Sequence, residues 1–414
     1  VPGRGAREKA QQNVLAAAEQ ATKGGQVHAL TITDNPGGNP AILAGCLGAE
    51  ILRLGIEPLV HFTCKDKNRN QIESELYALD RAEVRNLLVM SGDYPATGFQ
   101  GRPAPVFDLD PIHVFELIVQ MNRGLEYPGL KGTVRHQKSE FFPGAAVSPF
   151  KATEAEQMVQ YFKLRKKIGA GAQFVVTQLG YDARKFHEAL QFMRLGGLDV
   201  PLVGNIYVLP FGAAKLMNQN RIPGCVVTDK LMMDLDREKT EPDKGVKARL
   251  LRAARMYAFM KGMGFNGVHI GGHNLKYEEV EEIIAQGESL TPVWPELIAH
   301  FDYPQPDGFY LYERDPGTGL NTEVPTERRG RPLDAPVGLS YRNSRFFHRL
   351  MFEPEKRLFN AMRWICRSVN GTKVEGFFHK LEHLSKVLLF DCKDCGDCAL
   401  TDVAYNCPMS RCPK

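Results

Sequence analysis

The stretch Asn86-Leu-Leu-Val-Met90, followed directly by Ser91-Gly92-Asp93, is a short apolar run that ends in polar residues. Such a run is typical of a β-strand that is buried on both faces. Similar runs recur along the chain, and we expect each of them to be a strand. They are Val27–Thr33, Leu59–Thr63, Asn86–Met90, Ala145–Val147, Phe174–Thr177, Leu202–Gly204 and Gly267–Ile270.

Stretches with the pattern of helices separate these runs. They are Ala41–Leu54, Gln71–Arg81, Ile112–Met121, Glu154–Ile168, Lys185–Leu195 and Val246–Lys261. Strands that alternate with helices predict βαβ units and a parallel sheet. The pattern fits a (β/α)₈ TIM-type barrel of about 250 residues with one strand unaccounted for. We interpret Val1-Pro2 as the exit from that first strand, and a doubly wound open sheet is the alternative.

The overall composition is that of a globular protein. Of 414 residues, 43% are apolar and 24% are charged, and the net charge is +4. These values argue against a disordered or coiled-coil chain, and the charge balance does not indicate a nucleic-acid partner. No apolar run approaches the roughly 20 residues that cross a bilayer, so we expect a cytoplasmic protein without a membrane partner.

The last third of the chain changes character. Residues 301–340 are rich in Pro and Gly and lack periodicity, which marks a linker or a wrapping arm. Apolar residues recur at helical spacing beyond this stretch. We therefore expect a barrel over residues 1–295, a Pro/Gly-rich arm over 296–340, and a small helical Cys-rich metal-binding domain over 341–414.

The cysteines gather at the end of the chain. Nine are present, and five lie in the last 23 residues, at Cys392, Cys395, Cys398, Cys407 and Cys412. In a large chain this clustering favours a metal centre in a reducing compartment over disulfides. The i, i+3, i+6 spacing with a later Cys-Pro is similar to a ferredoxin run and favours a [4Fe–4S] cluster, although four thiolates would also hold zinc.

Polar residues follow several of the predicted strands. They include Thr33, His61, Gly92, Asp93, Gln178 and His273. A barrel places its ligand site at the carboxyl ends of its strands, so we expect these residues to share one site. Lys166 and Lys167 close a helix and either interact with its C-terminus or bind phosphate.

Several segments resemble the methylenetetrahydrofolate reductase family. They are His61-Phe-Thr-Cys64, the segment 85–95, the segment 166–172 with Val176-Thr-Gln178, and Arg221-Ile-Pro223. The resemblance covers about residues 1–290 in order. The tail from Glu382 to Cys398 is similar to the cysteine-rich C-terminal module of such reductases in some anaerobes.

The resemblance implies a barrel that binds a flavin (FAD or FMN) and reduces methylenetetrahydrofolate to methyltetrahydrofolate by hydride transfer from the reduced flavin. It implies that Asp93 is catalytic and lies between flavin and pterin. For the flavin it implies contacts with Thr33, His61, Gly92, Asp93, Lys166 and Lys167. For the substrate it implies contacts with Gln178, Phe211 and His273.

The sequence also departs from the family pattern. Ser91 and Val147 stand where the family has an Arg and a Tyr that hold the flavin. Gly271 and Leu275 stand where it has a Tyr and an Arg that contact folate. The family's general acid, a Glu in the first strand, aligns two residues before Val1, and we expect it in the native gene product.

The leading hypothesis is thus a flavin-dependent reductase whose tail connects it to an electron-donating protein, in an oligomer or a larger complex. Two alternatives use the same barrel. One is a pterin-binding methyltransferase, and the other is a non-catalytic subunit for electron transfer or scaffolding.

Overall fold

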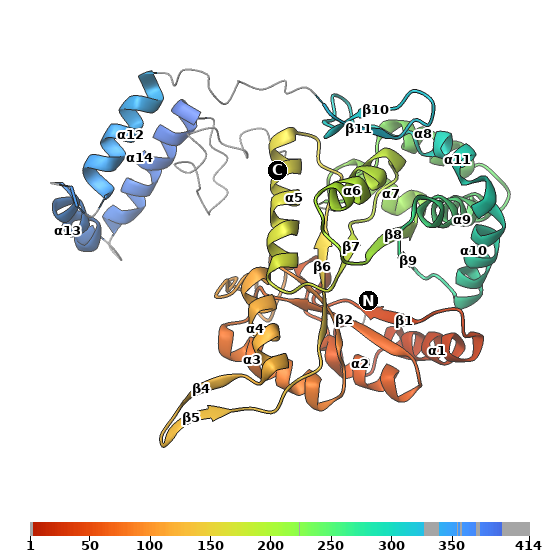
Figure 1. The fold of residues 1–414 in the computed structure, drawn as a ribbon, viewed down its shortest axis with the longest axis horizontal. Coiled ribbons are helices and arrows are strands. Elements are labelled where there is room, and N and C mark those ends of the chain that lie inside the picture. The colour runs from red at the N-terminus through yellow and green to blue at the C-terminus, as the bar shows by residue number, and fades with distance from the viewer. Residues whose placement is uncertain are drawn as a thin grey trace. The chain divides into compact units, whose positions relative to one another are not determined.

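One curled sheet of parallel strands organises the computed structural model (Figure 1). Its strands are β1 (Ala29–Ile32), β2 (Glu57–Thr63), β3 (Asn86–Met90), β6 (Phe142–Val147), β7 (Phe174–Thr177), β8 (Leu202–Val208) and β9 (Gly267–Gly272). Their order in the sheet follows the chain, and every neighbouring pair is parallel. A doubly wound sheet reverses its strand order at a switch point. The sequential order therefore favours the barrel over the doubly wound alternative.

The structure describes residues 3–222, 224–326, 339–353, 355–356, 358–369 and 373–390. The chain divides into two units, Val1–Ala152 with Gln157–Pro325 and Thr153–Glu156 with Thr326–Lys414. Helices accompany the strands of the first unit. They are α1 (Lys9–Gly24), α2 (Ala44–Arg53), α3 (Arg69–Arg81), α4 (Pro111–Arg123), α5 (Glu154–Gly169), α6 (Ala183–Leu195), α7 (Phe211–Asn218), α8 (Asp229–Glu238), α9 (Val246–Met263), α10 (Tyr277–Leu290) and α11 (Trp294–Leu297).

The sheet is open between its two edge strands, β1 and β9. Within the described residues, β1 pairs only with β2, and β9 pairs only with β8. The helical layer nevertheless continues across this seam, because α1 and α10 contact each other and Gln20 Nε2 donates to Glu278 Oε1 over 2.9 Å. The first unit is thus a curled, TIM-like barrel of seven described strands.

Side chains alternate between the two faces of the curled sheet. In β2, Val60 and Phe62 are buried in the core that contains residues of α2 and α3. A separate apolar cluster consists of Leu88, Phe174 and Val176 with Leu59, Met90 and Val203, and we assign it to the inside of the curl. Gly144 makes room there, since a Cβ at this position would collide with the Phe174 ring. The chain therefore packs the sheet on both faces.

The predicted strands Asn86–Met90 and Phe174–Thr177 have the observed bounds. Other elements differ at their ends, and several were not predicted. The elements that were not predicted are α1, α7, α8, α10, α11 and two hairpins, β4 (Glu126–Gly129) with β5 (Gly132–Arg135) and β10 (Tyr312–Arg314) with β11 (Asn321–Pro325). The second hairpin lies inside the stretch expected to be a linker or wrapping arm.

This hairpin packs against α6. The Arg184 guanidinium donates from Nε to Asn321 Oδ1 over 2.8 Å and from Nη2 to Tyr312 O over 2.7 Å. It also lies over the Tyr310 ring, with 3.8 Å between Cζ and the ring centroid. Residues up to Pro325 therefore wrap the first unit rather than leave it.

The second unit contains α12 (Leu339–Phe352), α13 (Phe359–Val369) and α14 (Lys373–Phe390). Neighbouring helices contact each other in sequence, α12 with α13 and α13 with α14. In the described part of the whole chain, no helix combines the length and the apolar character that a membrane span needs.

Candidate active site at the carboxyl edge of the sheet

The parallel sheet brings most of the predicted site residues to one edge. Thr33 follows β1, Gly92 and Asp93 follow β3, Gln178 follows β7, and His273 follows β9. His61 lies inside β2, and Phe211 is the first residue of α7, shortly after β8. Because parallel strands end at the same edge, these residues surround the mouth of the curled sheet. The backbone positions of these residues are therefore compatible with one shared site.

A buried ion-pair network fixes the turn after β1. Asp34 Oδ2 accepts from Thr63 Oγ1 over 2.6 Å and from Lys67 Nζ over 3.0 Å. Lys67 also donates to Glu75 Oε1 over 2.9 Å. Burial alone would lower the pKa of Lys67, but Asp34 and Glu75 outweigh it and raise this pKa. Lys67 thus stays charged and ties the exits of β1 and β2 together.

Thr33 has a free hydroxyl at this mouth. Its Oγ1 is buried and has no hydrogen-bond partner among the described residues. An unpaired buried hydroxyl costs about 1–3 kcal/mol, so a ligand that pairs with it would be stabilised. Ser148, directly after β6, has a buried Oγ in the same condition. Sequence reasoning missed Ser148, although its place after a strand was the available signal.

Asp93 is held in an accessible position by the backbone of two turns. Gly92 adopts φ 87°, and a Cβ there would lie 2.9 Å from Thr63 Cβ. The Asp93 side chain is exposed, and its Oδ2 accepts from Gly37 N over 2.8 Å. Burial, with the Asp93 carboxylate as a smaller cause, raises the pKa of the Cys225 thiol to about 11. The mouth thus presents one carboxylate beside a neutral thiol.

Two histidines stand inside the curl as neutral rings. Burial, and then the neighbouring His269, lower the pKa of His61 to about 4. Burial also lowers the pKa of His269, whose Nδ1 lies 3.1 Å from Asn205 Oδ1. Because neither ring is protonated near neutral pH, each can offer one donor and one acceptor. His269 therefore adds a polar group to the interior beside His61.

The lowered pKa of His61 predicts acid sensitivity. The unfolded chain binds a proton at this residue below about pH 6.5, whereas the folded chain does so only near pH 4. Stability should therefore rise with pH between these values and level off above them, with a contribution of about 3 kcal/mol from this residue. Urea unfolding between pH 4.5 and 7.5 measures it, and His61→Gln should flatten the profile. If the stability of His61→Gln rose with pH as steeply as that of the unaltered protein, His61 would not be the cause. The pH dependence would then come from His187, whose pKa burial also lowers to about 4.

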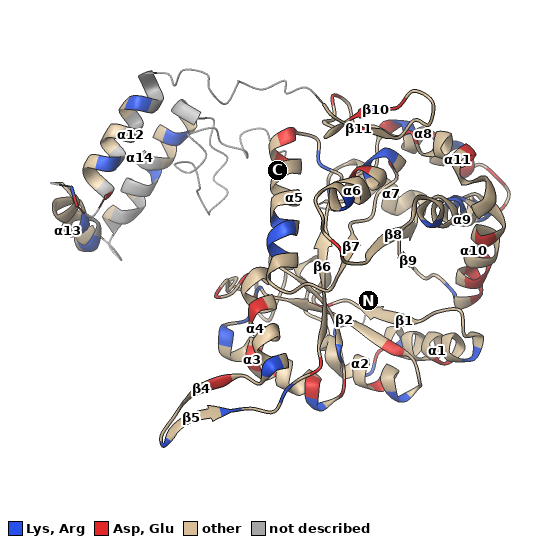
Figure 2. Cartoon of the chain, in the orientation of Figure 1, with Lys and Arg blue, Asp and Glu red and all other residues tan. Residues whose placement is uncertain are grey.

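Lys166 and Lys167, at the end of α5, have different surroundings. Lys167 Nζ donates to Ala146 O of β6 over 2.7 Å, and burial, followed by Lys163, lowers its pKa to about 8. Lys166 is exposed and lies over the Phe162 ring, with its Nζ 5.5 Å from the centroid. Figure 2 shows the basic residues of α5 gathered toward its C-terminal half. The structure thus brings Lys167, and not Lys166, to the sheet.

The predicted substrate residues occupy different sides of the mouth. Gln178 donates its backbone N–H to Val147 O over 2.7 Å, and its Oε1 accepts from Leu179 N over 2.9 Å. The His273 side chain is exposed, and its backbone N–H bonds to the Tyr207 phenol. The Phe211 ring packs against Lys239, whose Nζ lies 4.1 Å from the ring centroid. In the part of the chain that the structure describes, Gln178 Nε2 makes no hydrogen bond and can therefore donate to a ligand.

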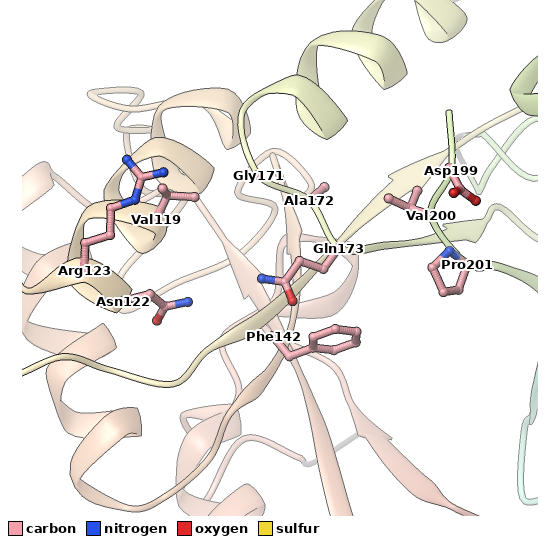
Figure 3. Close-up of a pocket in the computed structure, with 10 residues that line it drawn as sticks. All are labelled: Val119, Asn122, Arg123, Phe142, Gly171, Ala172, Gln173, Asp199, Val200 and Pro201. Atoms are coloured by element: carbon pink, nitrogen blue, oxygen red, sulfur yellow. The ribbon is translucent and has the colours of Figure 1, made fainter. Parts of the chain in front are cut away.

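A cavity of about 600 Å³ opens at the other end of the strands (Figure 3). Its lining includes Asn122 and Arg123 at the end of α4, Gln173 before β7, and Asp199 before β8. None of the predicted site residues belongs to it. In barrels the amino-terminal edge serves stability rather than catalysis, so we do not assign the site to this cavity.

The predicted metal ligands Cys392, Cys395, Cys398, Cys407 and Cys412 lie outside the described residues. Within the described ranges, no group of three or more His, Cys, Asp or Glu side chains is placed to hold a metal. The metal centre therefore stays a prediction.

A curled parallel sheet with polar groups collected at its carboxyl edge defines the class of α/β-barrel proteins that bind small ligands at that edge. Residues 6–287 match the family model described as methylenetetrahydrofolate reductase. Residues 372–414 match a second model, described as methylene-tetrahydrofolate reductase C terminal. The chain belongs to the methylenetetrahydrofolate reductase family.

Curated relatives carry the same family name. The chain is 25% identical over 247 residues to methylenetetrahydrofolate reductase 1 of Schizosaccharomyces pombe, a match that covers 58% of this chain and 37% of the relative. It is 23% identical over 239 residues to a probable methylenetetrahydrofolate reductase (NADPH) of Caenorhabditis elegans, covering 56% and 33%. The matches thus span about a third of the length of these relatives.

Solved structures align only weakly with this chain. A Clostridium thermocellum protein titled as binding two copies of 5-methyl-5,6,7,8-tetrahydrofolic acid aligns with a TM-score of 0.46 and 10% identity, covering 70% of this chain and 93% of that one. An aldo-keto reductase of Bacillus halodurans aligns with a TM-score of 0.39 and 12% identity, covering 72% and 88%.

Proposed function

We propose that this chain is the catalytic barrel of a reductase that converts methylenetetrahydrofolate into methyltetrahydrofolate with a bound flavin. The observation that carries the proposal is the group of Thr33, His61 and Asp93 at one edge of the sheet, in a chain of this family. The residues at the mouth fit such a cofactor. Thr33 and Ser148 hold buried hydroxyls that have no hydrogen-bond partner among the described residues, so a bound cofactor could pair with them.

The chemistry that a bound flavin would supply is hydride transfer. Thr33 and the neutral His61 would donate and accept hydrogen bonds at its edge. Lys167 would face its phosphate, since a buried ammonium gains most from an anion. Lys166 points away over Phe162, so we assign it a weaker, long-range role.

Asp93 would act on the substrate directly. Opening of the five-membered ring of methylenetetrahydrofolate produces an iminium cation, and a carboxylate beside it stabilises that charge. The Gly37 N–H holds the Asp93 oxygen in place without neutralising it. Gln178 would read the pterin edge with its amide, while Phe211 and His273 would contact the rest of the folate.

A single preparation tests this proposal. The full chain, purified without oxygen, should show flavin absorption, and after reduction by dithionite it should convert methylenetetrahydrofolate into methyltetrahydrofolate, detected by chromatography. Tight binding of methyltetrahydrofolate without any flavin would favour the methyltransferase alternative. Flavin that is bound but never reoxidised by the substrate would contradict the reductase.

The cysteine run supports a second part of the proposal. Cys392, Cys395 and Cys398, with Cys407 or Cys412, would hold a [4Fe–4S] cluster that receives electrons from a partner protein in a complex. Iron and sulfide analysis, with bleaching of the visible absorption by dithionite, tests this assignment. Zinc without iron would make the tail structural and would remove the electron path.

A further inference from the structure

A buried ammonium group without a hydrogen bond lies beside the proposed flavin site. Lys65 follows β2 by two residues, and its side chain is only 1% exposed. Its Nζ has no hydrogen-bond partner among the described residues. No part of the proposed function uses this group, and the resemblance does not assign it.

The exit of β3 fixes the position of Lys65. Its backbone N–H donates to Ser91 O over 3.1 Å. A Cβ at Gly92 would lie 3.0 Å from both Cγ and Cε of Lys65, so the aliphatic stem runs directly under the Gly92 backbone. The stem of Lys65 thus lies at the exit of β3, against the turn that leads to Asp93.

The only charge that pairs with Lys65 in the described residues is Asp66. The two groups are 3.2 Å apart, and the Asp66 side chain is 29% exposed. A lysine ammonium has three N–H donors. A desolvated ammonium with one partly hydrated partner leaves most of this capacity unused, so it favours the binding of a further acceptor.

We propose that Lys65 binds the phosphate of the flavin, together with Lys167 from α5. A phosphate carries up to two negative charges and several acceptor oxygens, so it can satisfy both lysines at once. Lys65 follows β2, and Lys167 Nζ donates to Ala146 O of β6, so in the sheet only β3 separates the two strands that carry these contacts. This assignment rests on the proposed function.

The test compares flavins with and without phosphate. Binding of riboflavin, FMN and FAD to the full chain is measured by flavin fluorescence, for the unaltered protein and for Lys65→Met, which keeps the stem and removes the charge. Lys65→Met should lower the affinity for FMN and FAD about 10- to 100-fold and change the affinity for riboflavin by no more than about twofold. Unchanged riboflavin affinity also shows that the variant is folded. Equal losses for all three flavins, or no loss for FMN, would overturn the assignment.

Asp66→Asn is the matched control. It removes the one ionic partner of Lys65 but keeps the ammonium, so FMN affinity should stay the same or increase. If the pair were only structural, Asp66→Asn and Lys65→Met would weaken FMN alike, and that result would reject the proposal. The proposal would also be rejected if Lys65→Met lowered only the affinity for tetrahydrofolate with a polyglutamate tail. The anion bound by Lys65 would then be a folate carboxylate and not the flavin phosphate. If the unaltered protein binds no flavin, the proposed function fails first and the phosphate assignment with it.

Discussion

Asp93→Asn is expected to lower the rate of methylenetetrahydrofolate reduction by about 10²- to 10³-fold. The asparagine keeps an oxygen that can accept the Gly37 N–H, so the turn after β3 should keep its shape. The change therefore removes the negative charge while it keeps the size and shape of the side chain. Because the iminium cation forms only on the way to the transition state, the loss should fall on kcat more than on KM.

The measurement is the reoxidation of reduced flavin by methylenetetrahydrofolate, followed in an anaerobic stopped-flow instrument. Asp199→Asn is a suitable control, since this exposed carboxylate lies before β8 at the opposite end of the strands. It should leave the rate unchanged. Full activity of Asp93→Asn would reject the catalytic role and would favour a barrel that serves as a scaffold.

The sequence predicted the sheet well where the local and the tertiary signals agree. Asn86–Met90 is apolar throughout and has polar neighbours, and its observed bounds are the predicted ones. The strand predicted as Ala145–Val147 starts earlier, at Phe142. Pro143 and Gly144 indicate a turn locally, yet Pro143 pairs with Leu87 of β3 in register, and Gly144 accommodates the Phe174 ring. These contacts join residues far apart in the chain, so no local pattern contains them.

The hairpin β10–β11 was hidden for the same reason. Its Pro- and Gly-rich surroundings are typical of a linker. What fixes it is Arg184, which bonds to Asn321 and to the carbonyl of Tyr312 across more than a hundred residues. The bounds of a strand held by such contacts cannot be derived from its own composition.

In the candidate site, too, some features could be predicted from the sequence and others could not. The types and the order of Thr33, His61, Asp93 and Gln178 were readable from the chain, because each stands in or directly after an apolar run. Their supports were not readable. Lys67 joins Asp34, which precedes it by 33 residues, to Glu75 on α3. A lysine in a polar stretch gives no sign that it will be buried between two carboxylates.

Lys67→Met should therefore destabilise the barrel by about 3–5 kcal/mol, because it leaves two buried carboxylates without their cation. Burial, which outweighs the attraction of Lys67, already raises the pKa of Glu75. Without Lys67 this pKa should rise further, so the folded variant would hold a proton that the unfolded chain releases. Its stability should then fall as pH rises, and the loss should be smaller near pH 5 than near pH 8.

Urea unfolding monitored by far-ultraviolet circular dichroism measures both effects. The double variant Lys67→Met/Glu75→Gln removes one of the two orphaned charges and should recover part of the loss, which a double-mutant comparison quantifies. A loss below about 1 kcal/mol, of the size found for exposed ion pairs, would show that water reaches the network. Asp34 accepts from Thr63 and directly follows Thr33, so a destabilised network should also weaken flavin binding. The exposed ion pair Arg69–Asp108 is the comparison, because removing its charge should change neither the stability by much nor the flavin affinity.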